Sequence, residues 1–286
     1  MATLKAIRRR IASVRSTQQI TRAMKLISAA RLRRAQENLL NARPYHEALK
    51  RVADSVLSTA PEVIAPAENA ARKALVIIVA SDRGLAGGYN INLLRLAEQE
   101  ARRGRSNGVE AEFFAVGRKA LDHFRRAGQA IAGERINNIP RLATVGLARE
   151  IGRLVLMQWR SGAICEAAVV YSVFRSALSQ RPTYEKLLPI EMAVEDGRPS
   201  ADYLVEPNAA ELVPVVLRSY VEAAILHALL EAEASEHGAR MTAMDAATNN
   251  AVEMIERLTL EMNRARQAAI TKELMDIVGG AEALRG

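Results

Sequence analysis

Residues 248–269, TNNAVEMIERLTLEMNRARQAA, carry the pattern that decides the fold. Apolar or small side chains recur there at alternating steps of three and four residues: Thr248, Ala251, Ile255, Leu258, Met262, Ala265 and Ala269. Such a heptad repeat predicts a helix with one apolar seam that needs a partner helix. We expect this helix to begin near Pro214 and to end at Gly279 and Gly280, because glycine is common just past a helix C-terminus.

The other end of the chain supplies the partner helix. Its apolar side chains also step by three, four and three residues: Leu4, Ile7, Ile11 and Val14. We expect a helix that begins after Thr3, a suitable N-cap, and that Pro44 kinks without ending, since the apolar pattern continues to about Leu57. Two helices this long are expected to form an antiparallel coiled coil rather than to lie separately on a domain. The expected seam residues are Ile7, Ile11, Val14, Ile255, Leu258 and Met262.

Between these helices, short apolar segments alternate with helical ones. Residues 74–80, ALVIIVA, are continuously apolar and rich in β-branched side chains, as expected of a buried parallel strand. Further strands are predicted over residues 109–116 and 167–174, and helices over residues 91–102, 118–126 and 147–160. This alternation predicts a doubly wound α/β sheet.

The chain therefore divides into four predicted segments. Residues 1–59 form the N-terminal coiled-coil helix and residues 60–73, which contain Pro61 and Pro66, form a linker. Residues 74–206 form the central α/β domain, and residues 207–286 form the C-terminal coiled-coil helix. The expected fold class is thus α/β, with a long antiparallel coiled coil added to the sheet.

Charge is spread unevenly along the 286 residues. The net formal charge is +8 at pH 7, but residues 1–50 hold 12 lysines and arginines against two acidic residues, a net of +10. An acidic partner is therefore expected, which can be nucleic acid, anionic lipid or an acidic protein. The longest uninterrupted apolar run, residues 74–80, is far shorter than the roughly 18 residues of a membrane span.

No set of side chains has the spacing of a catalytic or metal site. None of the four histidines stands at metal-ligand spacing from another: His46, His123, His227 and His237. We expect His227 and His237 to face solvent. The same is expected of three acidic side chains on the last helix: Glu231, Glu233 and Glu236. The single cysteine, Cys165, excludes an internal disulfide and is expected to be a buried thiol.

The glycine-rich turn over residues 81–90, SDRGLAGGYN, is the one place where a phosphate could be held. Its spacing is not G-x-G-x-x-G, and no G-K-[ST] follows. A tight structural turn is therefore expected in preference to a nucleotide site, and no cofactor is expected.

Three separated segments carry a family resemblance. Residues 17–24, TQQITRAM, lie in the first helix, and residues 81–92, SDRGLAGGYNIN, connect the first strand of the middle domain to its helix. Residues 265–281, ARQAAITKELMDIVGGA, are the most specific. Together they resemble the gamma subunit of the F-type ATP synthase, in its bacterial form, over essentially the whole chain. The chain lacks the cysteine-bearing insertion of the chloroplast form, and its tail AEALRG carries charge where the family is commonly alanine-rich.

The resemblance implies a rotor shaft inside a hexamer of alpha and beta subunits, coupling proton flow through the membrane c-ring to ATP synthesis or hydrolysis on the hexamer. The chain itself is then not an enzyme. Contact with the beta subunits is implied for Met24, Lys25, Arg266 and Gln267. Contact with the epsilon subunit and the c-ring is implied for Arg31, Arg33, Arg34, Tyr203 and Glu206. The implied location is the cytoplasmic face of the bacterial inner membrane, with no nucleic acid and no small-molecule substrate as partners.

Three alternatives remain open at this point. The first is a basic coiled-coil protein that binds nucleic acid, although the basic segment has one aromatic residue, Tyr45, and an apolar stripe that needs a helix. The second treats residues 1–36 as a mitochondrial transit peptide. The third is a nucleotide-using enzyme with the turn at Gly84 and Gly88 as its site.

Overall fold

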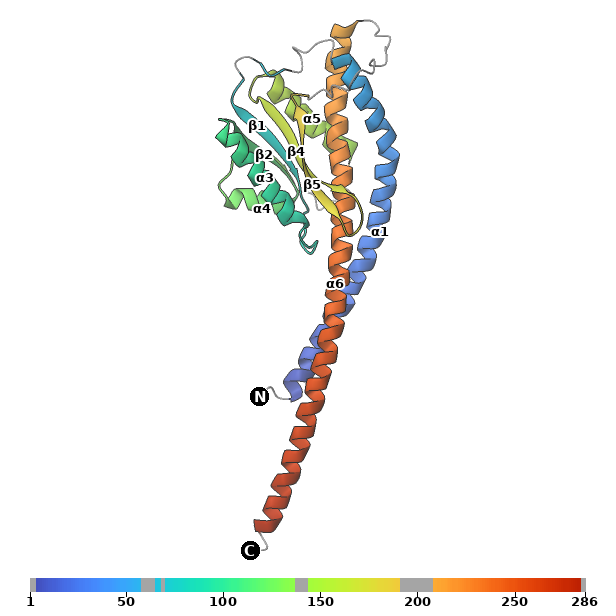
Figure 1. Cartoon of the computed structure of the whole chain (residues 1–286), viewed down its shortest axis with the longest axis vertical. Coiled ribbons are helices and arrows are strands. Elements are labelled where there is room, and N and C mark those ends of the chain that lie inside the picture. The colour runs from blue at the N-terminus through green and yellow to red at the C-terminus, as the bar shows by residue number, and fades with distance from the viewer. Residues whose placement is uncertain (1–3, 58–64, 68–69, 137–143, 191–207, 284–286) are drawn as a thin grey trace. The chain divides into compact units, whose positions relative to one another are not determined.

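The computed structural model describes residues 4–57, 65–67, 70–136, 144–190 and 208–283. The chain forms two compact units, which we call unit 1 (residues 1–27 and 241–286) and unit 2 (residues 28–240). The two end helices are α1, Leu4–Leu57, and α6, Ala209–Ala283. The predicted fold class, a mixed α/β sheet with long terminal helices, is confirmed (Figure 1).

The ends of the long helices differ from prediction. α1 runs through Pro44, as expected, whereas the expected N-cap Thr3 lies outside the described residues. α6 begins earlier than Pro214 and continues past Gly279 and Gly280. Neither glycine adopts the positive φ of a helix-ending glycine, so each stays in the helix at a cost of about 1 kcal/mol relative to alanine.

Unit 2 contains a five-stranded sheet in the order β3-β2-β1-β4-β5. The strands are β1 (Lys73–Val79), β2 (Glu110–Val116), β3 (Ile131–Arg135), β4 (Glu166–Phe174) and β5 (Gln180–Leu188). β1 pairs in parallel with β2 and β4, β2 pairs in parallel with β3, and β5 is antiparallel to β4. The order reverses at β1, which makes the parallel part doubly wound, as predicted.

Both faces of this sheet are covered, which is why its central strand is apolar throughout. Alternate side chains of β1 point to opposite faces. One set, which includes Ile77, packs against α5 (Val145–Arg160), the end of α1 and the first part of α6. The other set, which includes Val76, packs against α3 (Tyr89–Ser106) and α4 (Arg118–Arg126). Figure 1 shows these layers on the two sides of the sheet.

The two strands that the sequence analysis did not predict, β3 and β5, are the edges of the sheet. β3 has five residues, one of them Gly133, and β5 carries charged side chains and Pro182. Edge strands are often short, charged or proline-bearing, because such features discourage pairing with other chains. They therefore lack the continuous apolar pattern that identified the central strands.

α6 also contains, between Glu211 and Gly280, a stretch long and apolar enough to cross a membrane by length and composition only. Of its most apolar window, 44% is buried inside the protein. The core helix of a globular protein passes the same test, so this is weak evidence for a span.

Candidate functional site

In unit 1 the two end helices meet along a narrow apolar seam. Ile7, Ile11 and Leu258 are buried, and four further side chains pack against them: Val14, Ile255, Met262 and Ala265. The heptad pattern thus brings together all six residues expected on the seam. Few apolar groups leave water here, so each helix keeps most of its surface exposed.

Polar contacts continue the pairing beyond the apolar seam. The Thr248 hydroxyl is 2.8 Å from the Thr21 hydroxyl, and Lys25 Nζ is 2.5 Å from Asp245 Oδ1. Because numbers rise along α1 as they fall along α6, these contacts make the pairing antiparallel. The sequence analysis did not single out Thr21 or Asp245, although Thr248 stood in its heptad.

The four residues expected to face the beta subunits lie in unit 1. Met24 and Lys25 are half-buried on α1, whereas Arg266 and Gln267 are exposed on α6. Beyond them, every side chain from Ile270 to Gly280 is exposed. Five of these are large and apolar: Ile270, Leu274, Met275, Ile277 and Val278. This end of α6 offers both polar and apolar groups to another molecule.

The residues expected to meet the c-ring and epsilon subunit belong to unit 2. Arg31, Arg33 and Arg34 are exposed on α1, and Arg33 Nε lies 3.3 Å from Glu37 one turn later. Tyr203 and Glu206 lie outside the described residues.

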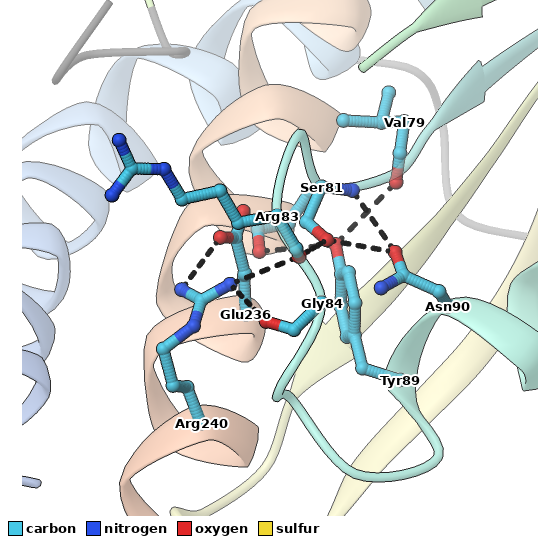
Figure 2. Close-up of polar contacts among 9 residues, drawn as sticks. Val79, Ser81, Arg83, Gly84, Tyr89, Asn90, Glu236 and Arg240 are labelled. Atoms are coloured by element: carbon cyan, nitrogen blue, oxygen red, sulfur yellow. Dashed lines mark hydrogen bonds and ion pairs between the residues drawn. The ribbon is translucent and has the colours of Figure 1, made fainter. Parts of the chain in front are cut away.

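The glycine-rich turn follows β1 directly and is held by its own polar groups (Figure 2). Asn90 Oδ1 accepts hydrogen bonds from the Ser81 backbone N–H and hydroxyl, each at 3.0 Å. Asp82 Oδ1 accepts one from the Arg118 N–H at 2.9 Å. Gly117 lies beside this turn at a φ of 95°, and a Cβ there would be 2.1 Å from the Ala80 carbonyl oxygen. These contacts keep the turn close to the end of β2.

An ion pair from α6 closes over the turn, as Figure 2 shows. Arg240 Nη1 lies 2.7 Å from Glu236 Oε1, and both side chains are about nine-tenths buried. The other Arg240 nitrogen, Nη2, donates to the carbonyl oxygens of Arg83 and Gly84 at 3.3 and 3.4 Å. The Tyr89 hydroxyl reaches the α6 backbone as well, 3.3 Å from the Ala232 carbonyl oxygen. The turn therefore anchors α6 to the sheet.

This anchor lies where doubly wound sheets usually bind ligands, at the carboxyl end of the strand where the order reverses. A bound phosphate would need backbone N–H donors. Here the carbonyl oxygens of Arg83 and Gly84 instead accept hydrogen bonds from Arg240. The chain's own helix thus takes the position that a nucleotide would need.

The expectation that the acidic face of α6 is solvated was wrong for two of its three residues. Glu231 is 4% exposed and Glu236 is 8% exposed. Burial raises the pKa of both carboxyls, and Arg240 opposes the rise at Glu236. Glu231 Oε2 accepts a hydrogen bond from the Phe174 N–H at 2.7 Å. Glu231 thereby joins α6 to β4, as the Glu236–Arg240 pair joins α6 to the turn.

The expectation that His227 and His237 face solvent was also wrong. His237 is 7% exposed, and burial lowers the pKa of each imidazole to about 4. The His227 ring stacks on His46 of α1, with centroids 4.3 Å apart and an angle of 8° between the rings. Two rings this close disfavour double protonation, because both would be positive.

The described residues contain no group of three or more His, Cys, Asp or Glu side chains that could hold a metal ion. Cys165 is half-buried rather than fully buried, and its thiol lies 3.4 Å from the Lys73 carbonyl oxygen.

Comparison with known proteins agrees with this arrangement over the full chain. A family model described as ATP synthase matches residues 3–284. The ATP synthase gamma chain of Pelotomaculum thermopropionicum is 46% identical over 99% of this chain and 100% of its own length. That of Moorella thermoacetica is 45% identical over 100% of both chains. A chain of the Euglena gracilis mitochondrial ATP synthase shares the fold, with a TM-score of 0.71, 21% identity, and coverage of 98% of this chain and 94% of its own.

Long paired end helices, an α/β sheet and these full-length matches together define a stalk protein. The chain belongs to the gamma-chain family of ATP synthase. Members of this family are the non-catalytic subunits of the central stalk, the rotor of that membrane-associated complex. The alternative of a nucleic-acid-binding protein finds no support in these comparisons.

The anchor residues on α6 were those that the sequence analysis missed. Glu236 and Arg240 are four residues apart and face the same side of the helix. Small residues surround them: Ala232, Ala234, Ser235, Gly238 and Ala239. At Gly238 a Cβ would lie 3.1 Å from the Phe174 ring. A run of small residues beside a charged pair is a signal of close packing that could have identified this buried face.

Proposed function

We propose that this chain turns inside a hexamer of alpha and beta subunits and transmits torque between that hexamer and a membrane c-ring, with the epsilon subunit bound beside it. The observation that carries the proposal is the form of unit 1. Its buried apolar contacts lie along one narrow seam, and most of its remaining surface is exposed, with charged and polar side chains between apolar ones such as Ile20, Leu260 and Ile270. A shaft that must turn in a close-fitting sleeve needs an internal seam and weak external contacts.

The contacts proposed with the beta subunits are Met24 and Lys25 on α1 and Arg266 and Gln267 on α6, of which the last three are polar. Exposed charged or polar pairs contribute about 0–1 kcal/mol each, because water and salt screen them. Such contacts can form and break as the shaft rotates. Lys25 already pairs with Asp245, so its charge is shared between the helix pair and any outer partner.

At the other end of the proposed torque path, Tyr203 and Glu206 meet the polar loop of the c-ring, with Arg31, Arg33 and Arg34 nearby. Tyrosine supplies apolar area with one polar tip, and a carboxylate accepts hydrogen bonds from a polar or basic loop. The proposed location is peripheral, on the cytoplasmic face of a bacterial inner membrane. ATP chemistry takes place on other subunits, so this chain carries no catalytic residue.

The first test is co-purification. The tagged chain should purify with alpha and beta subunits that hydrolyse ATP, and purification without any hydrolysing subunit would contradict the proposal. Within that complex, Arg266→Ala combined with Gln267→Ala should lower turnover while assembly is kept. Arg95→Ala on α3, an exposed arginine of unit 2, is the matched control and should leave turnover unchanged.

The second test separates the two ends of the torque path. Tyr203→Ala combined with Glu206→Ala should weaken attachment to the membrane sector, so that proton pumping falls while hydrolysis by the detached complex persists. Pumping and hydrolysis are measured side by side on membranes. Loss of both activities would place these residues in the shaft or its folding and not at the c-ring.

A further inference from the structure

One stretch of α1 in unit 2 is packed less firmly than the residues on either side of it. Leu39 is 4% exposed and Ala53 is fully buried, but no side chain from residue 40 to residue 52 is buried. Pro44 lies within this stretch and has no N–H, so α1 lacks the hydrogen bond that residue 44 would donate to the Leu40 carbonyl oxygen. A helix is expected to open first where packing and backbone hydrogen bonds are fewest.

His46 makes a ring contact between this stretch and α6. Its imidazole is half-buried and stacks on that of His227, with centroids 4.3 Å apart and an angle of 8° between the planes. His227 stands on a part of α6 that belongs to the core, where Ile225 and Leu229 are fully buried. The core therefore holds the α6 side of the contact in place, and the α1 side is the one that can separate.

The charges around the two rings act in opposite directions on a bound proton. His227 Nε2 lies 3.8 Å from Glu231 Oε1, beyond hydrogen-bond distance, and the other oxygen of Glu231 accepts from the Phe174 N–H. His227 Nδ1 is buried and has no hydrogen-bond partner among the described residues. Further charges come from α1, from β5 and from the residue after β4: Arg43, Glu47, Lys50, Glu185 and Arg175.

Burial outweighs the carboxylates and favours the neutral rings. It is the largest cause that lowers the pKa of both imidazoles, and the pKa of His227 falls to about 4. A ring released into water regains the ordinary pKa of about 6.5, so it binds a proton more tightly than the stacked ring does. The contact is therefore most stable above pH 6.5 and weakens as the pH falls towards 4. Two protonated rings at this spacing would also repel each other.

We propose that the His46–His227 stack is an acid-sensitive contact, which keeps residues 40–52 of α1 against α6 while both rings are neutral and releases them when the rings are protonated. Leu39 and Ala53 stay packed at either end, so the change is a local opening and not the unfolding of unit 2. Over the open stretch α6 loses its companion helix, and the helix pair becomes more flexible. The proposal concerns contacts within this chain and does not depend on the proposed function.

Hydrogen exchange of the full chain, followed by mass spectrometry of α1 peptides at pH 7.5 and 5.0, tests the proposal. Measured rates are divided by the intrinsic exchange rate at each pH, because the exchange chemistry itself depends on pH. The protection of residues 40–52 should fall at least about tenfold at pH 5.0, since a ring with a pKa of about 4 when stacked and about 6.5 when free favours opening by at least that factor. Peptides of β1 and of α6 around Ile225 should keep their protection.

Four variants assign the effect to the two rings. His46→Gln and His227→Gln each replace an ionisable ring by a neutral polar side chain, so each should reduce the loss at pH 5.0, and their combination should abolish it. His46→Lys places a positive charge beside His227 and should lower the protection of residues 40–52 already at pH 7.5. The matched control is His123→Gln on α4, a histidine that pairs with Glu98 of α3 on the other side of the sheet. It should leave the response of residues 40–52 unchanged.

A titration of the histidine Hε1 resonances in the parent chain adds a check that needs no substitution. His46 and His227 should titrate over the pH range in which the protection of residues 40–52 is lost, and titration outside that range overturns the proposal. So does equal protection at pH 7.5 and 5.0, or a loss of protection throughout unit 2. A double glutamine variant that keeps the response of the parent chain, or a His123→Gln variant that loses it, also overturns the proposal.

Discussion

α6 passes through both units and is used differently in each. In unit 2, the segment from Glu231 to Arg240 is buried except for the half-buried Glu233. In unit 1, the segment from Ile270 to Gly280 is entirely exposed. One continuous helix is thus a core element in one unit and a free surface in the other, so its composition must be judged segment by segment.

The difference also extends to the source of stability. Unit 2 has two large apolar clusters, one on each face of the sheet. Over its described residues, unit 1 has one cluster with three buried side chains. Since burial of apolar area supplies most of the favourable free energy of folding, unit 2 is expected to be the more stable unit. Unit 1 keeps most of its surface exposed.

The largest effect is expected from Arg240→Ala. The change leaves Glu236 buried without its ion-pair partner and removes the Arg240 hydrogen bonds to two carbonyl oxygens of the turn. Loss of one member of a buried pair costs about 3–5 kcal/mol. Urea unfolding followed by the fluorescence of Trp159, the chain's one tryptophan and a buried residue of unit 2, measures the loss.

The control for this change is Arg33→Ala, which removes an exposed pair with Glu37 on α1. It should shift the free energy of unfolding of unit 2 by less than about 0.5 kcal/mol. Equal effects of the two variants would show that the α6 anchor adds nothing beyond a surface ion pair.

A direct comparison of the two units uses one large-to-small change in each. Ile225→Ala removes a fully buried side chain from the large cluster of unit 2 and should cost about 2–5 kcal/mol. Leu258→Ala acts on the small cluster of unit 1, where surrounding side chains can collapse more easily, and should cost less. Hydrogen exchange of α1 and α6 amides reports on each unit. A larger loss for Leu258→Ala would reverse the ranking of the two units.

Acid should weaken unit 2 selectively, because all four histidines belong to it. The pKa of His227 and of His237 falls to about 4 in the folded chain. Below pH 6.5 the unfolded chain binds protons that the folded chain does not, so the stability present above pH 6.5 is lost progressively as the pH falls towards 4. Lowering a pKa by one in the folded chain corresponds to about 1.4 kcal/mol of folding free energy.

The measurement is the urea midpoint of Trp159 fluorescence at pH 7.5 and 5.5, a range above most carboxyl titrations. His227→Gln combined with His237→Gln should flatten this dependence. A midpoint in the double variant that falls as steeply as in the parent chain would assign the acid sensitivity to other groups.

The smallest effect is expected from Lys25→Ala in unit 1. Its ion pair with Asp245 is partly exposed, with side-chain exposures of 39% and 46%, so it should contribute about 0.2–1 kcal/mol. The stability lost in Lys25→Ala should be smaller at high salt, because salt screens exposed charges. Hydrogen exchange at low and high salt measures it, and a loss that does not depend on salt would point to packing of the lysine stem instead.

Prediction from sequence succeeded where a pattern repeats locally. The heptad of α6 and the steps of α1 identified the seam residues, and the apolar run of β1 identified the central strand. It failed at β3 and β5, because edge strands are not continuously apolar. The prediction that α6 ends at Gly279 and Gly280 also failed. Residue type alone does not distinguish a glycine that ends a helix from a glycine inside one.

By itself, the sequence determined the elements whose pattern follows from backbone geometry, namely the two end helices and the three central strands β2, β1 and β4. Its motifs also identified the family. Only the tertiary structure decided which polar side chains are buried. Glu236, Arg240 and His227 are ordinary surface residues by type, and the small residues around Glu236 and Arg240 indicate close packing without saying what packs there. Their burial depends on partners more than 150 residues away along the chain, Arg83 for the ion pair and His46 for the imidazole. Such contacts exist only once the sheet and α1 have packed against α6, because a desolvated charge is tolerated only where a partner compensates it.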